Sequence, residues 1–155
     1  MTIGNLSAVK STESCSPKKK YALKRRILVS GSSQKDIAPF EVELDELPPG
    51  ATNYPFHYHT IDHEFFVVIS GSGKLRTSKG MHPIKGGDFF DFPPREPHQI
   101  INDSAAPLIY YVIANNSHGH DACFYPDSNK WGFDAIDAAG KITTVSEVGY
   151  YHGEE

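Results

Sequence analysis

Apolar and polar residues alternate with a period of two over much of the chain from residue 39 onward. The clearest case is 40–45, where apolar and acidic residues alternate strictly before Pro48-Pro49-Gly50, which is typical of a half-buried β-strand ending at a turn. Further strands are expected at 54–59, 64–70, 74–78, 88–92, 98–102 and 108–114. Glycine-rich turns at 71–73 and 85–87 separate several of them. The pattern predicts an all-β fold.

Some of the expected strands are apolar on both faces. In 65–69, Phe66 and Val68 lie on one face, and the residues between and beside them are also apolar. Both faces must then be covered, as in a double-layered barrel or at a subunit interface. We therefore expect a homodimer as the default assembly. Towards the end of the chain we expect a short helical turn at 134–140 and a last strand at 142–150, packed outside the barrel.

The chain has the length of one domain, and no internal repeat is visible among its 155 residues. Residues 1–18 are polar and lack apolar periodicity, so a disordered tail is expected there. The remainder, 19–155, is expected to form a single domain, with a barrel core at about 25–115 and a C-terminal extension.

The charge of the chain is unevenly distributed and argues against nucleic acid as a partner. Residues 1–26 hold seven of the fifteen lysines and arginines and one acidic residue, which leaves eight basic and eighteen acidic residues, or −10, in 27–155. Phosphate binding requires a positive surface. The basic run at 18–26 is interpreted as a solvated flank of the first strand, with a targeting segment as the alternative.

Composition also bears on location. The apolar stretches are far shorter than the roughly 20 residues that a membrane helix requires, so no membrane association is expected. The first residues lack the apolar segment of a secretory signal. The two cysteines, Cys15 and Cys123, are expected to be free thiols, which suits a reducing cytoplasm.

Three histidines and one glutamate have the spacing of a metal site. His57 and His59 are two residues apart on an expected strand and therefore share one face. Glu64 follows after a short turn and begins the next strand, so an antiparallel neighbour can return its carboxylate to the imidazoles. His98 begins another strand after a proline-stiffened turn and can supply a fourth ligand.

These segments resemble the two motifs of the cupin superfamily, G-x5-H-x-H-x3,4-E-x6-G and G-x5-P-x-G-x2-H-x3-N. The first motif is matched, with one extra residue after the first glycine, at Gly50, His57, His59, Glu64 and Gly71. The second is matched at Gly87, Pro93, His98 and Asn102. Arg95 stands where the family usually has a glycine, whose role there is to permit a positive φ.

The resemblance implies a cupin-type double-stranded β-helix, also called a jelly-roll barrel, with short terminal extensions. It implies that His57, His59, Glu64 and His98 bind a divalent metal ion, although some cupins lack metal. Iron or manganese is expected from the family, while the ligand types also suit zinc, nickel, cobalt or copper. In an octahedral ion these ligands leave two positions open, which is typical of a reactive site.

Three functions remain open for such a site. The first is a small-molecule enzyme, a mononuclear iron or manganese oxygenase of the dioxygenase type, which needs a dry pocket. The second is a sugar-phosphate isomerase or epimerase, which needs a base and cations for the phosphate. The third is a non-catalytic module that binds a small ligand. The sequence reveals no pairing of a general acid with a general base.

Some other residues could take part in chemistry, but each also has a purely structural interpretation. His63, beside Glu64, is an alternative ligand or a histidine of the turn. Lys74 and Arg76 share a strand face and offer an anion site or a solvated edge.

Two further groups of residues also have both a functional and a structural interpretation. A loop rich in glycine and asparagine holds residue types of a second metal cluster, without rigid strand spacing: His118, His120, Asp121 and Cys123. Four aromatic residues at strand spacing are expected in the core, with a pocket lining as the alternative: Phe66, Phe90, Phe92 and Tyr110.

Overall fold

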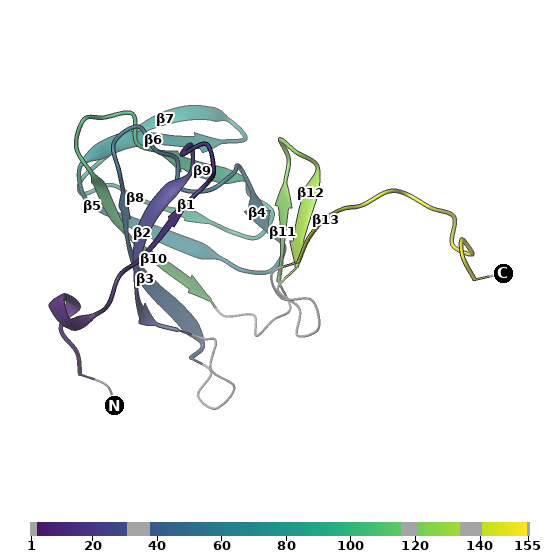
Figure 1. Cartoon of the computed structure of the whole chain (residues 1–155), viewed down its shortest axis with the longest axis horizontal. Coiled ribbons are helices and arrows are strands. Elements are labelled where there is room, and N and C mark those ends of the chain that lie inside the picture. Colours follow the sequence, from purple (N-terminus) through teal and green to yellow (C-terminus); the bar gives the residue numbers. More distant parts are fainter. Residues whose placement is uncertain (1–2, 31–37, 116–120, 134–140, 155) are drawn as a thin grey trace.

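The computed structural model describes residues 3–30, 38–115, 121–133 and 141–154 (Figure 1). Apart from one short 3-10 turn, η1 at Leu6–Ala8, the regular elements of this part of the chain are β-strands. The strands are β1 Thr12–Cys15, β2 Ala22–Val29, β3 Phe40–Leu47, β4 Tyr58–His59, β5 Glu64–Ser70, β6 Ser72–Thr77, β7 Gly80–Lys85, β8 Phe89–Phe92, β9 His98–Ile101, β10 Leu108–Asn115, β11 Ala122–Tyr125, β12 Lys130–Phe133 and β13 Lys141–Thr144. The all-β prediction is confirmed.

The strands form a double-stranded β-helix. The main sheet has the order β1-β2-β3-β10-β5-β8, and a second sheet has the order β7-β6-β9. The pairings within both sheets are antiparallel. A smaller sheet, β13-β12-β11-β4, lies to one side of these layers (Figure 1). It contains β11 and β12, which the sequence did not predict.

The hydrophobic core lies between the main sheet and the β7-β6-β9 sheet. Phe66 and Val68 of β5 are almost fully buried there, together with Ile100 of β9 and Tyr110 of β10. On the opposite face of β5, Ile69 is 49% exposed, so a single chain does not cover both apolar faces. The expected homodimer would cover this face, and it stays a prediction.

Strand β3 places its acidic face towards the interior. Glu43 is only 9% exposed and Asp45 is fully buried, whereas Phe40, on the apolar face, is 45% exposed. The alternation correctly indicated a strand with two different faces, but apolar character did not identify the inner one. The acidic face is tolerated inside because Arg25 of β2 forms ion pairs with both carboxylates.

The terminal segments differ in part from expectation. Thr12–Cys15, within the expected tail, pairs with β2 as an edge strand, although its residues are exposed and lie outside the core. The predicted last strand is shorter and begins earlier, as Lys141–Thr144. The helical turn expected at 134–140 lies outside the described residues. The described part of the chain has no helix with the length and hydrophobicity to cross a membrane.

Candidate metal centre

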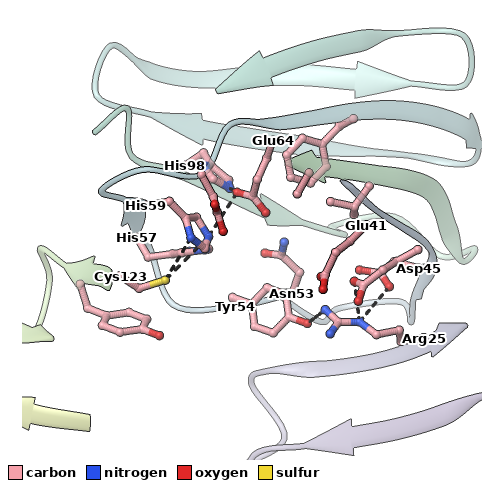
Figure 2. Close-up of a pocket in the computed structure, with 16 residues that line it drawn as sticks. Arg25, Glu41, Asp45, Asn53, Tyr54, His57, His59, Glu64, His98 and Cys123 are labelled. Atoms are coloured by element: carbon pink, nitrogen blue, oxygen red, sulfur yellow. Dashed lines mark hydrogen bonds and ion pairs between the residues drawn. The ribbon is translucent and has the colours of Figure 1, made fainter. Parts of the chain in front are cut away.

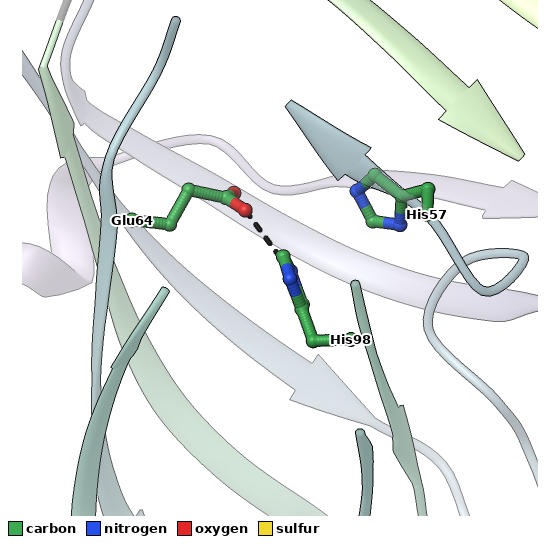
Figure 3. A group of neighbouring side chains, drawn as sticks. All are labelled: His57, Glu64 and His98. Atoms are coloured by element: carbon green, nitrogen blue, oxygen red, sulfur yellow. Dashed lines mark ion pairs between the residues drawn. The ribbon is translucent and has the colours of Figure 1, made fainter. Parts of the chain in front are cut away.

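The backbone brings His57 and His98 side by side. His57 N donates to His98 O at 3.2 Å, and His98 N donates to His57 O at 2.9 Å, so the two residues are direct antiparallel neighbours. Their ring centroids are 4.8 Å apart. Glu64, the first residue of β5, extends towards them from the main sheet (Figure 3).

The side chains of His57, Glu64 and His98 form a group with the donor types of a metal site. One ligand atom from each lies within 4.8 Å of the others. Glu64 Oε2 is 3.0 Å from His98 Nε2 and 3.5 Å from Nε2 of His59, which joins the group from β4. Glu64 Oε2 is buried and has no hydrogen-bond partner of suitable geometry among the described residues. A shared cation would satisfy this oxygen, so the residues fit a metal ion.

The outward nitrogens of the imidazoles have acceptors that orient the rings. His57 Nδ1 is 2.8 Å from Pro55 O, and His59 Nδ1 is 2.6 Å from Asp121 Oδ2. His98 Nδ1 has a longer contact of 3.4 Å with the backbone oxygen of residue 96. When Nδ1 donates its proton outward, Nε2 carries the lone pair and is ready to coordinate.

Asp121 is a positioning residue that sequence reasoning assigned to a different group. Its Oδ1 accepts hydrogen bonds from Ile61 N at 2.9 Å and Thr60 Oγ1 at 3.1 Å, while Oδ2 contacts His59. Cys123 lies opposite His59 in the β4–β11 pair, with Sγ 3.3 Å from His59 Nδ1. Asp121 and Cys123 therefore both contact the outward nitrogen of His59.

The other two members of the predicted second cluster, His118 and His120, lie outside the described residues. The pairing of β11 with β4 brings Asp121 to a histidine 62 positions earlier. A carboxylate in a loop gives no local signal for such a distant partner.

The charges of the group are strongly coupled. Burial opposes ionisation of Glu64, yet the close approach of His98 and the fields of the other imidazoles hold its pKa at about 2. Burial and the neighbouring His98 lower the pKa of His57 to about 4. Burial also opposes protonation of His59, but the hydrogen bond to Asp121, the contact with Cys123 and the charge of Glu64 together outweigh burial and raise the pKa of His59 to about 11. A metal ion that binds His59 at neutral pH must displace its proton.

Residues around the ligands hold them in place. The ring of Phe92 stacks on His98 with 4.1 Å between centroids, which confirms a packing role for this aromatic residue. Arg95 has a φ of 72°, so the turn keeps the left-handed conformation that glycine usually supplies, and Arg95 N donates to His59 O at 2.7 Å. Buried Asn102 donates to Leu47 O at 2.8 Å.

His63 lies away from the centre. Its Nε2 is 2.9 Å from Asp91 Oδ2, and both side chains are about half exposed, at 48% and 60%. Glu64, the next residue, points into the barrel because successive side chains on a strand face opposite sides. Glu64 therefore lies beside the imidazoles of the candidate centre, and His63 does not.

A cavity of about 300 Å³ adjoins the candidate metal centre (Figure 2). The candidate metal-binding residues line one side: His57, His59, Glu64 and His98. Three acidic residues of β3 line another: Glu41, Glu43 and Asp45. We call these three residues the carboxylate wall. Phe66 contributes to the lining, but Phe92 and Tyr110 do not. This volume is at the lower end of the range for small-molecule sites, roughly 300–1,000 Å³.

Arg25 connects the carboxylate wall to Tyr54, another residue of the cavity lining. Its Nε is 2.9 Å from Glu43 Oε2 and 3.4 Å from Asp45 Oδ1, and its terminal nitrogen donates to the Tyr54 hydroxyl. Burial raises the pKa of Glu43 to about 7 and that of Asp45 to about 6, against the attraction of Arg25. Acid–base groups that titrate near neutrality are therefore present, although the sequence did not reveal them.

Lys74 and Arg76 do not reach this cavity. Both lie on β6, where Lys74 Nζ is 2.8 Å from Asp103 and Arg76 forms two hydrogen bonds to Asp127 at 2.6 and 2.8 Å. The cavity lining does not include them. The alternative of a solvated strand face fits better than an anion site for these two side chains.

Comparisons with known proteins agree with the fold. The "Cupin domain" family model matches residues 43–114. A provisionally named sugar phosphate isomerase from Acidithiobacillus ferrooxidans is 22% identical, with 96% of each chain covered and a TM-score of 0.75. A sugar phosphate isomerase of the cupin superfamily from Silicibacter pomeroyi is 24% identical, with 94% of this chain and 96% of that chain covered and a TM-score of 0.74.

A more distant structure shows that the barrel is shared by proteins of different activity. The polyketide cyclase RemF from Streptomyces resistomycificus is 23% identical, with 74% of this chain and 79% of that chain covered and a TM-score of 0.61. A search of curated protein sequences gives no match. The matched residues contain both ordered motifs, from Gly50 to Asn102, and the barrel around them is a double-stranded β-helix. Residues 43–114 therefore form a cupin domain, and the barrel that contains them has the cupin fold.

Proposed function

We propose that His57, His59, Glu64 and His98 bind one divalent metal ion, and that the protein is a metal-dependent isomerase of small hydroxycarbonyl compounds. The converging Nε2 atoms and the unsatisfied Glu64 Oε2 support the metal site. Iron or manganese is the proposed metal from the family, and the ligand types also suit zinc, nickel, cobalt or copper.

One observation carries the isomerase proposal: the metal-ligand group and the carboxylate wall line the same small cavity. A bound divalent ion polarises a carbonyl oxygen and makes the neighbouring C–H more acidic. Glu43, with a pKa of about 7, is suited to take that proton and return it to the adjacent carbon. Arg25 holds the Glu43 carboxylate in position through its contact of 2.9 Å.

Similarity to two proteins named as sugar phosphate isomerases supports this proposal over nearly the whole chain. Because each is less than 25% identical, the likeness concerns the fold, and the assignment of activity rests on the cavity.

An iron or manganese dioxygenase is the second candidate. Four ligands leave two positions of an octahedral ion, which suits an oxygenase. A dry pocket would favour that chemistry, whereas acidic side chains line this cavity. A non-catalytic ligand-binding cupin is the third, and it would show neither activity.

Two measurements distinguish these functions. Elemental analysis of freshly isolated protein should find about one divalent transition metal per chain. In D2O, the metal-loaded protein should exchange the proton beside the carbonyl of aldoses or ketoses, as followed by NMR. Oxygen uptake with thiols or catechols, without such exchange, would instead support the dioxygenase.

A pair of variants on one strand tests the role of Glu43. Glu43→Gln should retain metal and lose proton exchange. Glu46→Gln is the control, since Glu46 lies on the outer face of β3, 3.8 Å from Lys24 and 31% exposed. Unchanged exchange in Glu43→Gln would exclude Glu43 as the base.

We also propose a cytoplasmic location, which the free thiols of Cys15 and Cys123 support. A homodimer stays our proposal for the assembly, and sedimentation at micromolar concentration tests it.

A further inference from the structure

The carboxylate wall gives the cavity an acidic side that is built into the barrel. Its residues occupy alternate positions of β3, so all three face the cavity. Glu43 is 9% exposed and Asp45 fully buried, which distinguishes them from ordinary surface acids. A ligand in the cavity must therefore be compatible with acidic side chains at close range.

The positive charge of Arg25 is already paired with two carboxylates of this wall. Its Nε approaches both Glu43 and Asp45. Another nitrogen donates to Tyr54, and Figure 2 shows the guanidinium beside Asp45 and Tyr54. One guanidinium is shared by Glu43 and Asp45, so it is not a free cation for a ligand. A ligand anion would compete with two buried carboxylates for a cation that they surround.

Within the described lining of the cavity, Arg25 is the only lysine or arginine. The other basic residues considered as an anion site, Lys74 and Arg76, are paired with Asp103 and Asp127 on β6. A phosphate group is usually held by several arginines, lysines or backbone N–H groups. Beyond the proposed metal ion, the described lining therefore offers a phosphate ester only one arginine, which is already paired with carboxylates.

The same wall suits ligands that donate hydrogen bonds. Asp45 Oδ2 is buried, belongs to a residue that lines the cavity, and has no hydrogen-bond partner among the described residues. An oxygen of this kind calls for a donor such as a hydroxyl group. Tyr125, whose ring is 5.9 Å from that of His57, offers an aromatic surface nearby for the C–H face of a ligand.

We infer that the cavity binds an uncharged, hydroxyl-rich carbonyl compound, such as a free sugar, and discriminates against the phosphorylated form of the same compound. The inference deepens the proposed isomerase function and rests on it. It differs from what the names of the similar structures would suggest, because it selects the free sugar over the sugar phosphate.

Calorimetric titration of the full-length, Mn²⁺-loaded protein tests the inference directly. The probes are D-fructose and D-ribose, their phosphate esters D-fructose 6-phosphate and D-ribose 5-phosphate, and the cationic D-glucosamine. We expect at least one free sugar to bind about tenfold or more tightly than its ester, because repulsion between like charges acts within a cavity of low dielectric. An ester that binds as tightly as its free sugar overturns the inference.

Other results would overturn it as well. Tighter binding of glucosamine than of any neutral sugar would show that the wall selects cations, and no binding of a free sugar at millimolar concentration would remove the ligand class. Glu41→Gln should reduce the discrimination against esters, whereas Glu46→Gln, on the outer face of the same strand, should leave it unchanged. Equal behaviour of the two variants would count against the wall as its cause.

Binding and turnover separate this inference from the proposed function. If free sugars bind preferentially but incorporate no deuterium from D2O, the isomerase proposal fails and the ligand class stands. If an ester exchanges deuterium and binds more tightly than its free sugar, the isomerase proposal stands and the inference about the ligand is wrong.

Discussion

The carboxylate of Asp121 should determine how well His59 binds metal. Asp121 is 5% exposed and uses both oxygens: Oδ2 is 2.6 Å from His59 Nδ1, and Oδ1 accepts from Ile61 N at 2.9 Å and Thr60 Oγ1 at 3.1 Å. Asp121→Asn keeps the size of the side chain but has a single acceptor oxygen. One of the two sides must then face an NH2 group, so either the loop or the imidazole loses its acceptor.

The size of the effect follows from this loss. Removal of the acceptor behind a metal-binding histidine weakens metal affinity by about 10- to 100-fold, or about 1.4–2.7 kcal/mol. The contact of 2.6 Å and the burial of Asp121 place the expected loss within that range rather than below it. The pKa of His59, which is about 11 beside Asp121, should also fall in the variant, because the charge that stabilises the imidazolium is removed. The metal then displaces a less firmly bound proton, which offsets part of the loss.

Competition with a chelator for Mn²⁺ or Zn²⁺ measures the affinity of parent and variant. Asp91→Asn is a matched control, since it removes a carboxylate 2.9 Å from His63 Nε2 in an exposed pair away from the site. We expect Asp91→Asn to keep the parent affinity. If Asp121→Asn also keeps it, or if both variants lose affinity equally, the proposed role of Asp121 is refuted.

Three further predictions concern the ligand set, a motif glycine and pH. Glu64→Gln should weaken metal binding by about 10- to 100-fold or more while His63→Gln retains it, as chelator competition can measure; the reverse result would mean that the motif is misaligned at the carboxylate. Gly71→Ala should lower the free energy of unfolding by roughly 2–4 kcal/mol in urea melts, since φ is +86° and the new Cβ would overlap the carbonyl oxygen that precedes β10. Gly87→Ala, at φ +93° but with open space around the new Cβ, should lower it by about 1–2 kcal/mol. Equal losses in the two variants would contradict the steric reason. The folded pKa of Glu43 is raised to about 7 from 4.5, so the folded state binds this proton more firmly than the unfolded chain, and the group costs stability as pH rises from about 4.5 to 7. In urea melts, the free energy of unfolding of Glu43→Gln should therefore gain roughly 1–3 kcal/mol relative to the metal-free parent between pH 5 and pH 8. A difference that stays constant with pH would show that the pKa of Glu43 is not raised.

Local patterns in the sequence identified most of the barrel strands and selected the candidate metal-binding residues, which the fold brings together. Period-two alternation indicated β3, because side chains on a strand alternate between faces whatever the strand packs against, and short apolar runs between turns indicated β5 and β10. The same rule placed His57 and His59 on one face, and the spacing to Glu64 selected it over His63, as the geometry supports. These features depend on a few consecutive residues and so can be read locally.

The left-handed turn at Arg95 could be inferred only indirectly. The motif requires a positive φ there, and the structure has 72° despite the side chain. Tertiary contacts, including the hydrogen bond from Arg95 N to His59 O, stabilise a conformation that local preference disfavours.

The inner face of β3 and the partner of His59 were decided only by the tertiary structure. Alternation shows that a strand has two faces, but the position of Arg25 on the neighbouring strand determines that Glu43 and Asp45 can be buried. Asp121 reaches His59 because β11 pairs with β4 across a long stretch of sequence. Both contacts are set by strand pairing over long separations, and the order of residues along the chain does not encode such pairings locally.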